Sequence, residues 1–237
     1  MIDILITCYN KEDTITEVIN SVAQLSNINK IIIIDDASTD NSLKIITKIS
    51  QKFRNVDINI NETNQGVAES RNELLNKSTC EYIAFVDGDD IIIPDEKQKQ
   101  IEFVLENKDI DFCYSDYRVG RNVKRSLPFD YNALKSYNYI PFSSVICRRK
   151  FLTERYMKFE KTFHEDYWLW LNCLCRLDHE TVSYFPSATY IYGTGENRIT
   201  SNKFKSAYHT FLLLSKFHGY PYIPFRYIVH NLKKRLW

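Results

Sequence analysis

The sequence predicts an α/β fold: a mostly parallel sheet flanked by helices, then a mixed, irregular second half and C-terminal helices. In the first half, short apolar segments alternate strictly with segments of helical periodicity, which is typical of βαβ units. Two apolar segments, "KIIIID" and "YIAFV", are continuous runs, as expected of strands buried on both faces. Polar and acidic residues follow these segments, at the edge where parallel sheets bind ligands.

The elements of the first half follow in order along the chain. Strands are expected over 2–7, 30–35, 56–61 and 82–87, and helices over 12–25, 41–50, 67–76 and 95–107. The segment 12–25 places Ile15, Val18, Ile19 and Val22 on one helical face. The segment "VDININ" instead alternates with the period of two of a strand. Residues 1–109 are therefore expected to form the ligand-binding half.

The regularity fades after about Asp109. Short strand-like pieces, "DFCYSDY", "SSVICRR", "TVSYF" and "ATYIY", surround one strong helix, "EDYWLWLNCLCRL". We expect residues 110–200 to continue the same sheet as a mixed second half. Residues 201–237 look like two helices joined at "HGYPYIP" and form a basic, aromatic tail.

Bulk composition is that of an ordinary globular protein. The 237 residues carry a net charge of +1, which argues against nucleic acid as a partner. No apolar run approaches the ~18 residues of a membrane span, and the N-terminus does not resemble a signal peptide. Six cysteines without a CxxC pair indicate reduced core residues. A cytoplasmic protein is expected.

The C-terminal tail is unusually charged. From residue 197 to residue 237 there is no Asp or Glu, against eight Lys or Arg. Basic and aromatic residues on a terminal helix suit peripheral contact with the inner face of an anionic membrane. A helix that packs on the domain or makes a dimer contact explains the tail equally well, so the oligomeric state stays open.

An acidic cluster, Asp87-Gly88-Asp89-Asp90, follows the strand at 82–87. Carboxylates this close repel one another and need a balancing positive charge. A hard cation, Mn²⁺ or Mg²⁺, that arrives with a diphosphate would provide it. Each acid alone can be explained as a cap or turn residue, Asp90 in particular. Neither a dinucleotide-binding glycine motif nor a P-loop follows the first strand.

Five motifs in order carry a resemblance to a known family. These are "ILITCYNKEDTITEVINSV", "IIIIDDASTDNS", "TNQGVAESRNELL", "EYIAFVDGDD" and "HEDYWLWL". Residues 2–200 resemble family-2 glycosyltransferases of the GT-A fold. The resemblance implies an inverting transferase that moves a sugar from a nucleotide-diphosphate donor, most often UDP-linked, to a glycan or lipid-linked acceptor. Bacterial surface polysaccharide synthesis is the expected setting.

The resemblance assigns the donor site residue by residue. Thr7 and Tyr9 match the positions that cradle the nucleotide base, and Asp36 matches the acid that accepts a hydrogen bond from it. Arg71 and Asn72 match a segment near the donor.

The metal and diphosphate positions follow the family's DxD motif. Asp87 is expected toward the ribose or sugar and Asp89 toward the metal, with Asp87 as a possible second ligand. The segment "YGTGENRITS" departs from the family, because Gly195 replaces a His near the metal. Arg198 can contact the diphosphate instead, or lie on the surface as a solvated side chain.

The catalytic base implied by the resemblance is Asp166, the second acid of "HED". From the residues alone, Asp166 can also be a capping acid at a helix N-terminus. Glu165 is expected to shape the acceptor pocket, and Trp168 and Trp170 to lie mostly in the core. Two other functions stay open: a sugar nucleotidyltransferase, which would want a glycine-rich basic loop after the first strand, and a binding module without a base.

Overall fold

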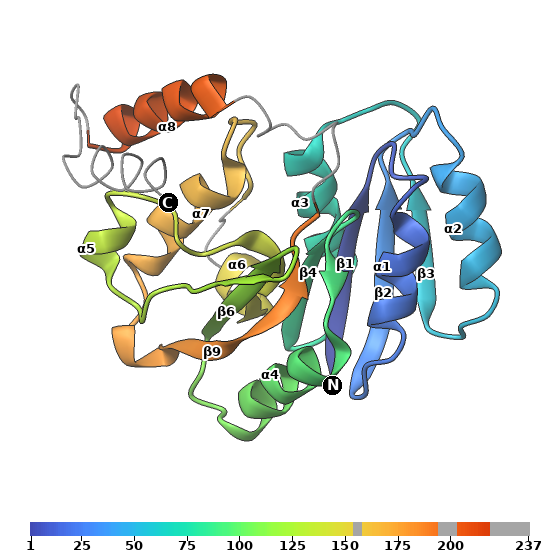
Figure 1. Ribbon diagram of the computed structural model, residues 1–237, viewed down its shortest axis with the longest axis horizontal. Coiled ribbons are helices and arrows are strands. Elements are labelled where there is room, and N and C mark those ends of the chain that lie inside the picture. Colours follow the sequence, from blue (N-terminus) through green and yellow to red (C-terminus); the bar gives the residue numbers. More distant parts are fainter. Residues whose placement is uncertain (154–157, 194–202, 219–237) are drawn as a thin grey trace.

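The computed structural model describes residues 1–153, 158–193 and 203–218 (Figure 1). The first half holds β1 (Ile2–Cys8), α1 (Ile15–Val22), β2 (Ile28–Asp35), α2 (Ser42–Ser50), β3 (Val56–Ile60), α3 (Val67–Lys77), β4 (Tyr82–Asp87), β5 (Ile91–Ile92) and α4 (Pro94–Glu106). The second half holds β6 (Phe112–Val119), β7 (Asn122–Lys124), α5 (Tyr131–Leu134), η1 (Phe142–Ser144), β8 (Ile146–Arg148), α6 (Arg149–Thr153), α7 (Glu165–Leu174), η2 (His179–Thr181), β9 (Val182–Ile191) and α8 (Lys203–His218).

Within the described residues, one mixed sheet runs through both halves in the order β3-β2-β1-β4-β8-β6-β9-β5, with β7 paired to β6. The first four strands are parallel, and β8 runs antiparallel to both β4 and β6. The α/β architecture with a mostly parallel first half and a mixed second half is therefore confirmed. Since β1, β2 and β4 end at the same edge, their final residues lie side by side.

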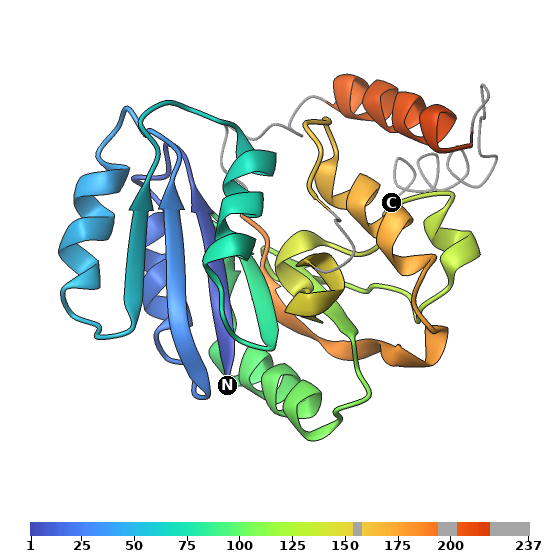
Figure 2. The ribbon, with the colours of Figure 1, turned by 180° about the vertical axis from the view of Figure 1, so that it is seen from behind.

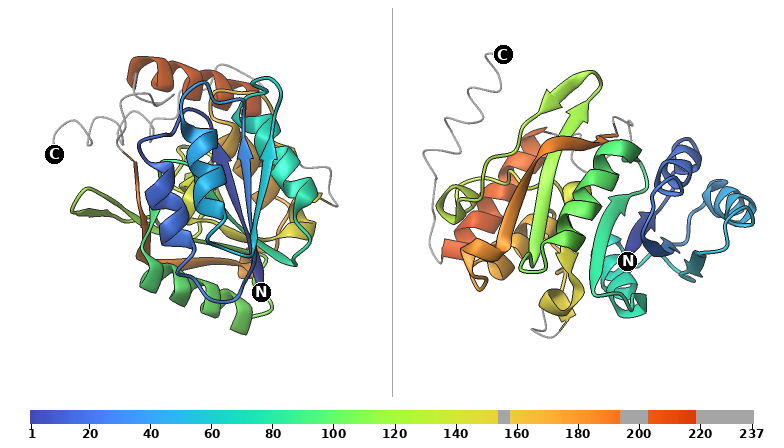
Figure 3. Two further views of the ribbon diagram at one scale, coloured as in Figure 1. Left: turned by 90° about the vertical axis from the view of Figure 1, so that its right-hand side faces the viewer. Right: turned by 90° about the horizontal axis from the view of Figure 1, so that it is seen from below.

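Each face of the sheet has its own apolar core, because successive strand residues point to opposite faces. On one face, Ile4 and Ile6 pack with residues of α1, α2 and α4. On the other, Leu5 and Phe85 pack with residues of α3, α6 and α7. Figure 2 shows α3 on the rear face, and Figure 3 shows α1 and α2 on the opposite side of the strands from α3.

The structure differs from the expected elements in one place, where two expected strands are one, and it contains short elements that were not expected. The pieces "TVSYF" and "ATYIY" are one strand, β9, which continues through Pro186. The pairing register of β9 with β6 shifts at this point, between Ser115 and Asp116 of β6, so the proline interrupts the ladder without ending the strand. The short elements β5, β7, α5 and α6 were not expected. No described helix has the length and apolar character needed to cross a bilayer.

Candidate active site

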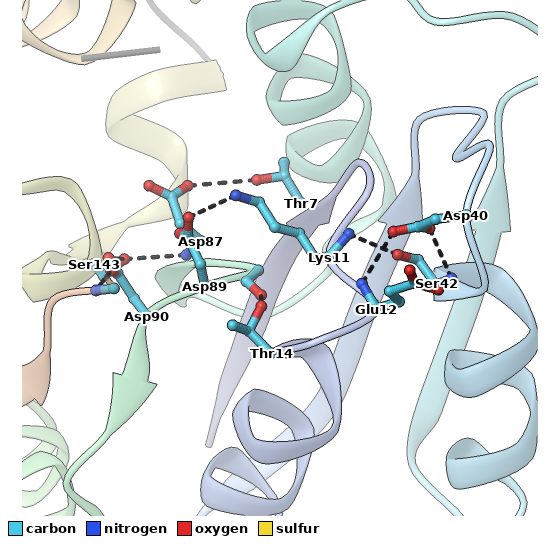
Figure 4. A network of polar contacts seen from close by, with 12 residues as sticks. Thr7, Lys11, Glu12, Thr14, Asp40, Ser42, Asp87, Asp89, Asp90 and Ser143 are labelled. Atoms are coloured by element: carbon cyan, nitrogen blue, oxygen red, sulfur yellow. Dashed lines mark hydrogen bonds and ion pairs between the residues drawn. The ribbon is translucent and has the colours of Figure 1, made fainter. Parts of the chain in front are cut away.

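The expected acidic cluster lies at the end of β4, where side-chain cations approach it. Asp87 ends the strand, and its Oδ1 accepts a hydrogen bond from Arg71 Nη2 at 2.8 Å and a longer one from Thr7 Oγ1 at 3.5 Å. Lys11 Nζ lies 2.6 Å from Asp89 Oδ2. Figure 4 shows Lys11 reaching from the loop after β1 to this carboxylate. The balancing positive charges among the described residues are thus Lys11 and Arg71.

Gly88 allows the close approach that this arrangement needs. A Cβ at this position would lie 2.7 Å from the carbonyl oxygen of Thr7, closer than real Cβ atoms come to backbone. Thr14 Oγ1 donates to the carbonyl oxygen of Gly88 at 2.8 Å, which ties the start of α1 to the cluster. The ends of β1 and β4 therefore pack directly against each other.

Arg71 on α3 is the centre of a buried ion network. Its Nη2 binds Asp87, its Nη1 forms a short contact with Glu165 Oε1, and its guanidinium lies 3.4 Å from the centroid of the Phe142 ring. Burial opposes the charge on Arg71, but Asp87, Glu165 and Asp166 outweigh it and raise the pKa of Arg71. Burial raises the pKa of Glu165, although Arg71 acts in the opposite direction. Arg71 thus links the donor edge to the start of α7.

Asp90 does more than cap a turn. Its backbone N–H donates to the carbonyl oxygen of Asp87, as a turn residue would. Its side chain is buried and accepts from Ser143 Oγ at 2.6 Å and from the backbone N–H of Gly193 at 2.9 Å. Ser143 Oγ in turn accepts from the N–H of Asp87. Burial, with Asp87 and Asp89 nearby, raises the pKa of Asp90 well above its ordinary value.

The ends of β1 and β2 hold the residues expected at the base. The Tyr9 side chain is 43% exposed, so its ring is accessible to a planar ligand. Asp36 is buried, and its carboxylate accepts from Asn61 Nδ2 and from the backbone N–H groups of Gln65 and Gly66, at 2.7 to 2.8 Å. Asp36 therefore fixes the loop before α3. Two of the three bonds end on Oδ1 and one on Oδ2, so one lone pair, on Oδ2, is left to accept a further hydrogen bond.

The expected catalytic acid opens α7. Glu165 and Asp166 form the first turn of this helix, after His164 at the N-cap position. Asp166 is half-buried and accepts from Asn138 Nδ2 at 3.3 Å. Glu165 was expected to shape an acceptor pocket, but it points inward to Arg71. Trp170 is buried in the core, whereas Trp168 is half-buried and packs on Phe217 of α8.

The structure thus gathers several of the expected residues at one edge. Thr7 and Arg71 both donate to Asp87, and Asp166 is close enough to raise the pKa of Arg71. Asn72 turns away from the donor edge and exchanges hydrogen bonds with the backbone of Phe159. Arg198 and Gly195 lie outside the described residues.

Sequence reasoning missed Lys11, Ser143 and Lys97. Lys11 could have been suspected, because "YNK" places a basic residue directly after the strand that pairs with β4. Ser143 and Lys97 carried no signal, since both reach the cluster only through the fold. Lys97 of α4 is fully buried, and its Nζ donates to the carbonyl oxygen of Ser143 at 3.2 Å.

The side chains at this edge show how well it could bind a divalent cation. Among the described residues, no three His, Cys, Asp or Glu side chains form a metal cluster. Asp87 and Asp89 supply carboxylate oxygens, which suit Mg²⁺ or Mn²⁺ when a diphosphate completes the shell. Lys11 and Arg71 already share these carboxylates, so a cation would compete with them. These carboxylates therefore suit a metal ion that binds together with a diphosphate better than a metal ion bound by the protein alone.

Known proteins share the sequence pattern of this chain. The sequence profile described as "Glycosyl transferase family 2" matches residues 3–170. An uncharacterized glycosyltransferase of Haemophilus influenzae is 34% identical over 91% of this chain and 88% of its own length. The UDP-Glc:alpha-D-GlcNAc-diphosphoundecaprenol beta-1,3-glucosyltransferase WfgD of Escherichia coli is 29% identical over 99% of this chain and 94% of its own.

Solved structures share the fold at lower identity. S. aureus TarS 1–349 in complex with UDP-GlcNAc superposes with a TM-score of 0.72 at 23% identity over 85% of this chain. This chain spans 60% of that TarS chain. The mannosyltransferase PcManGT of Pyrobaculum calidifontis, in complex with GDP-Man and Mn²⁺, gives a TM-score of 0.72 at 15% identity over 97% of this chain and 68% of its own.

Proposed function

The chain belongs to glycosyl transferase family 2, and from this premise we propose that it transfers a sugar from a UDP-linked donor to a hydroxyl of a lipid-linked saccharide, with inversion at the anomeric carbon. One observation carries the proposal. The Arg71 guanidinium joins Asp87, at the donor edge of the sheet, to Glu165, next to the acid expected to act as base. The two halves of a transfer site therefore meet on one buried side chain.

The donor is proposed from the strand ends and the relatives together. Tyr9 offers an exposed ring to a nucleobase, and Oδ2 of Asp36 has one lone pair left to accept from the base. The name of WfgD states UDP-Glc as donor, and the TarS structure contains UDP-GlcNAc. PcManGT, with GDP-Man, shows that the same fold accepts another base, so uridine is the preferred choice among several.

Asp87 and Asp89 would hold the divalent cation, Mn²⁺ or Mg²⁺, which would supply positive charge to the departing diphosphate. Lys11 and Arg71 lie at the same carboxylates and add two fixed positive charges there. Both side chains therefore contribute to stabilising the negative charge that develops on the leaving group. Arg198, outside the described residues, stays a candidate for the same role.

Asp166 is proposed as the general base. It would remove the proton from the acceptor hydroxyl while that oxygen attacks the anomeric carbon on the face opposite the diphosphate. Its neighbour Glu165 is held by Arg71, which fixes the first turn of α7 and hence the direction of the Asp166 side chain. Rate enhancement would come from alignment and electrostatics, without a covalent enzyme intermediate.

The acceptor is proposed from two relatives. WfgD and WfaP of Escherichia coli, the latter 33% identical over 86% of this chain, are both named for transfer to alpha-D-GlcNAc-diphosphoundecaprenol. A lipid-linked saccharide in bacterial surface polysaccharide synthesis is therefore the acceptor class to test first. Such an acceptor would place the enzyme at the inner face of the membrane.

The roles can be separated with the variant Asp166→Asn. We expect it to lose transfer from UDP-sugar to a lipid-linked GlcNAc acceptor by about 10³-fold or more, while UDP affinity stays within about twofold. Asp109→Asn, at an exposed acid between α4 and β6, is the matched control and should keep full activity. Transfer at the normal rate in Asp166→Asn would contradict the assignment of the base.

A further inference from the structure

Helix α8 has two contrasting faces. Thr210, Leu213 and Leu214 are buried against the domain. On the opposite side, Phe204, Tyr208 and Leu212 are 80%, 60% and 42% exposed. These three residues are spaced four apart, so they form one continuous stripe along the helix. We call Phe204, Tyr208 and Leu212 the apolar stripe.

The stripe is the main concentration of exposed large apolar side chains in the described part of the chain. The others are scattered singly or in pairs over distant elements: Met1, Tyr9, Ile60, Val123 and Leu127. Scattered apolar residues need no explanation on a protein surface, but a contiguous row of aromatic and aliphatic side chains marks an interaction surface.

The inward face of α8 contacts the helix that carries the proposed base. His164 Nε2 lies 3.1 Å from the carbonyl oxygen of Ser206 and 3.0 Å from Thr210 Oγ1. The ring of Phe163 stacks on that of His209, with centroids 4.3 Å apart. Since Glu165 and Asp166 follow His164 directly, the apolar stripe lies about one helix diameter, ~10 Å, from the start of α7.

The placement of α8 in the molecule suits an approach from outside. Figures 1 and 2 show α8 at the outer end of the molecule, on the side toward which the parallel strands β1, β2 and β3 run. Helix α8 therefore lies toward the same end of the molecule as the donor edge of the sheet.

The charge of this region indicates which kind of surface the stripe contacts. From residue 197 to residue 237 the chain has eight Lys or Arg and no acid, and Lys205 lies beside the stripe with its side chain exposed. In the described part of the chain Lys205 is exposed, and Lys216 pairs with Glu160. A helix with a row of aromatic and leucine side chains, in a segment of the sequence that has basic residues and no acid, is the combination that binds an anionic lipid surface.

We propose that the apolar stripe of α8 docks on an anionic lipid surface and inserts its side chains among the headgroups. This places the start of α7 next to the membrane. The proposal goes further than the proposed function, from which it takes only the reason why a lipid surface would be useful. Lipid binding itself is independent of donor, acceptor and turnover.

Vesicle co-sedimentation of the full chain tests the proposal. Binding to vesicles of phosphatidylglycerol and phosphatidylcholine is compared with binding to phosphatidylcholine alone, at low and high salt. The stripe variant changes Phe204, Tyr208 and Leu212 each to Ser. The control variant changes Ile60, Val123 and Leu127, three exposed apolar residues on other elements, each to Ser.

We expect wild type to pellet with the anionic vesicles, less so at high salt, and the stripe variant to bind about tenfold or more weakly. The control variant should match wild type. Circular dichroism and the melting temperature establish that both variants fold, and the single change Tyr208→Glu, at an exposed position, offers a milder second variant. Since these vesicles contain no saccharide acceptor, lipid binding and transfer can fail independently.

Three outcomes would overturn the proposal. Equal pelleting of wild type and stripe variant would remove the stripe from lipid binding. A wild-type dimer that becomes monomeric in the stripe variant, without vesicle binding, would make a second copy of the chain the occupant. A stripe variant that melts well below wild type, again without wild-type vesicle binding, would show that residues 219–237 cover the stripe.

Discussion

Replacing Arg71 by Met tests the ion network that joins the two halves of the site. Met keeps much of the length and apolar volume of the side chain but removes the charge and all five N–H donors. The change leaves Asp87 and Glu165 without their shared cation. The free-energy cost of the unpaired charge should be larger at Glu165, because its side chain is 11% exposed, whereas that of Asp87 is 26% exposed and better solvated.

Breaking a buried pair by removing one partner costs about 3–5 kcal/mol, and the low exposure of the Arg71 side chain, 4%, places this variant in that class. The cost should depend on pH. Burial already raises the pKa of Glu165, and Arg71 is the largest of the influences that lower it. Without Arg71 the pKa of Glu165 rises further. The Glu165 carboxyl group then stays protonated to a higher pH in the folded state than in the unfolded state. Stability therefore falls as pH rises from the unfolded pKa to the folded pKa.

Urea unfolding at pH 5 and pH 8 measures both effects. We expect Arg71→Met to be destabilised more at pH 8 than at pH 5, by about 1.4 kcal/mol for each unit that the pKa of Glu165 rises. Adding Glu165→Gln should restore about 2 kcal/mol at pH 8, because it removes the unpaired charge. Arg54→Met, at an exposed Arg, should change stability by less than about 0.5 kcal/mol.

A loss below about 1 kcal/mol in Arg71→Met, or a double variant no more stable than Arg71→Met, would refute the reasoning. Either result would mean that the guanidinium does not hold the two carboxylates together in solution.

Three further changes probe the same edge. Burial lowers the pKa of Lys97 to about 7, so above pH 7 the unfolded state binds more protons than the folded state and the stability of wild type rises with pH. Lys97→Met should abolish this rise. The stability difference between Lys97→Met and wild type should therefore change by about 2 kcal/mol between pH 7 and pH 9 in urea unfolding. Gly193→Ala would place a Cβ 2.2 Å from the carbonyl oxygen of Asp89, so we expect a loss of about 1–3 kcal/mol together with weaker UDP binding; calorimetry that finds both unchanged would speak against it. Lys11→Met removes the competitor for Asp89 and should tighten binding of Mn²⁺ alone by about fivefold in a calorimetric titration, whereas weaker binding would disprove the competition.

The first half of the fold could be predicted because local pattern and tertiary burial agree there. Each strand from β1 to β4 was expected within two residues of its observed bounds. The apolar residues of β1, β2 and β4 are buried on both faces of the sheet, whereas β3 is a half-buried strand that its alternating pattern identifies. In the second half, Pro186 suggested a break between two strands, but the register shift of β9 against β6 absorbs it. Elements of two to five residues, such as β5 and α6, have too little periodicity to be found.

In the candidate site too, some residues could be predicted from the sequence and others could not. The carboxylates at 87, 89 and 166 could be named as candidates, because they stand in motifs that resemble those of the family. The partners of these carboxylates could not, since Lys11 lies 78 residues before Asp89 and Glu165 lies 94 residues after Arg71. Only the fold reveals that Glu165 serves Arg71, and that Asp90 joins Ser143 to Gly193.

The most direct measurement is the melting temperature of wild type and Asp89→Asn with UDP, GDP, CDP and dTDP, each with and without Mn²⁺. We expect UDP with Mn²⁺ to stabilise wild type by about 3 kcal/mol at a hundredfold excess over its dissociation constant, and Asp89→Asn to lose most of this gain. If no nucleoside diphosphate raises the melting temperature of wild type under any of these conditions, the donor site proposed at the end of β4 does not exist.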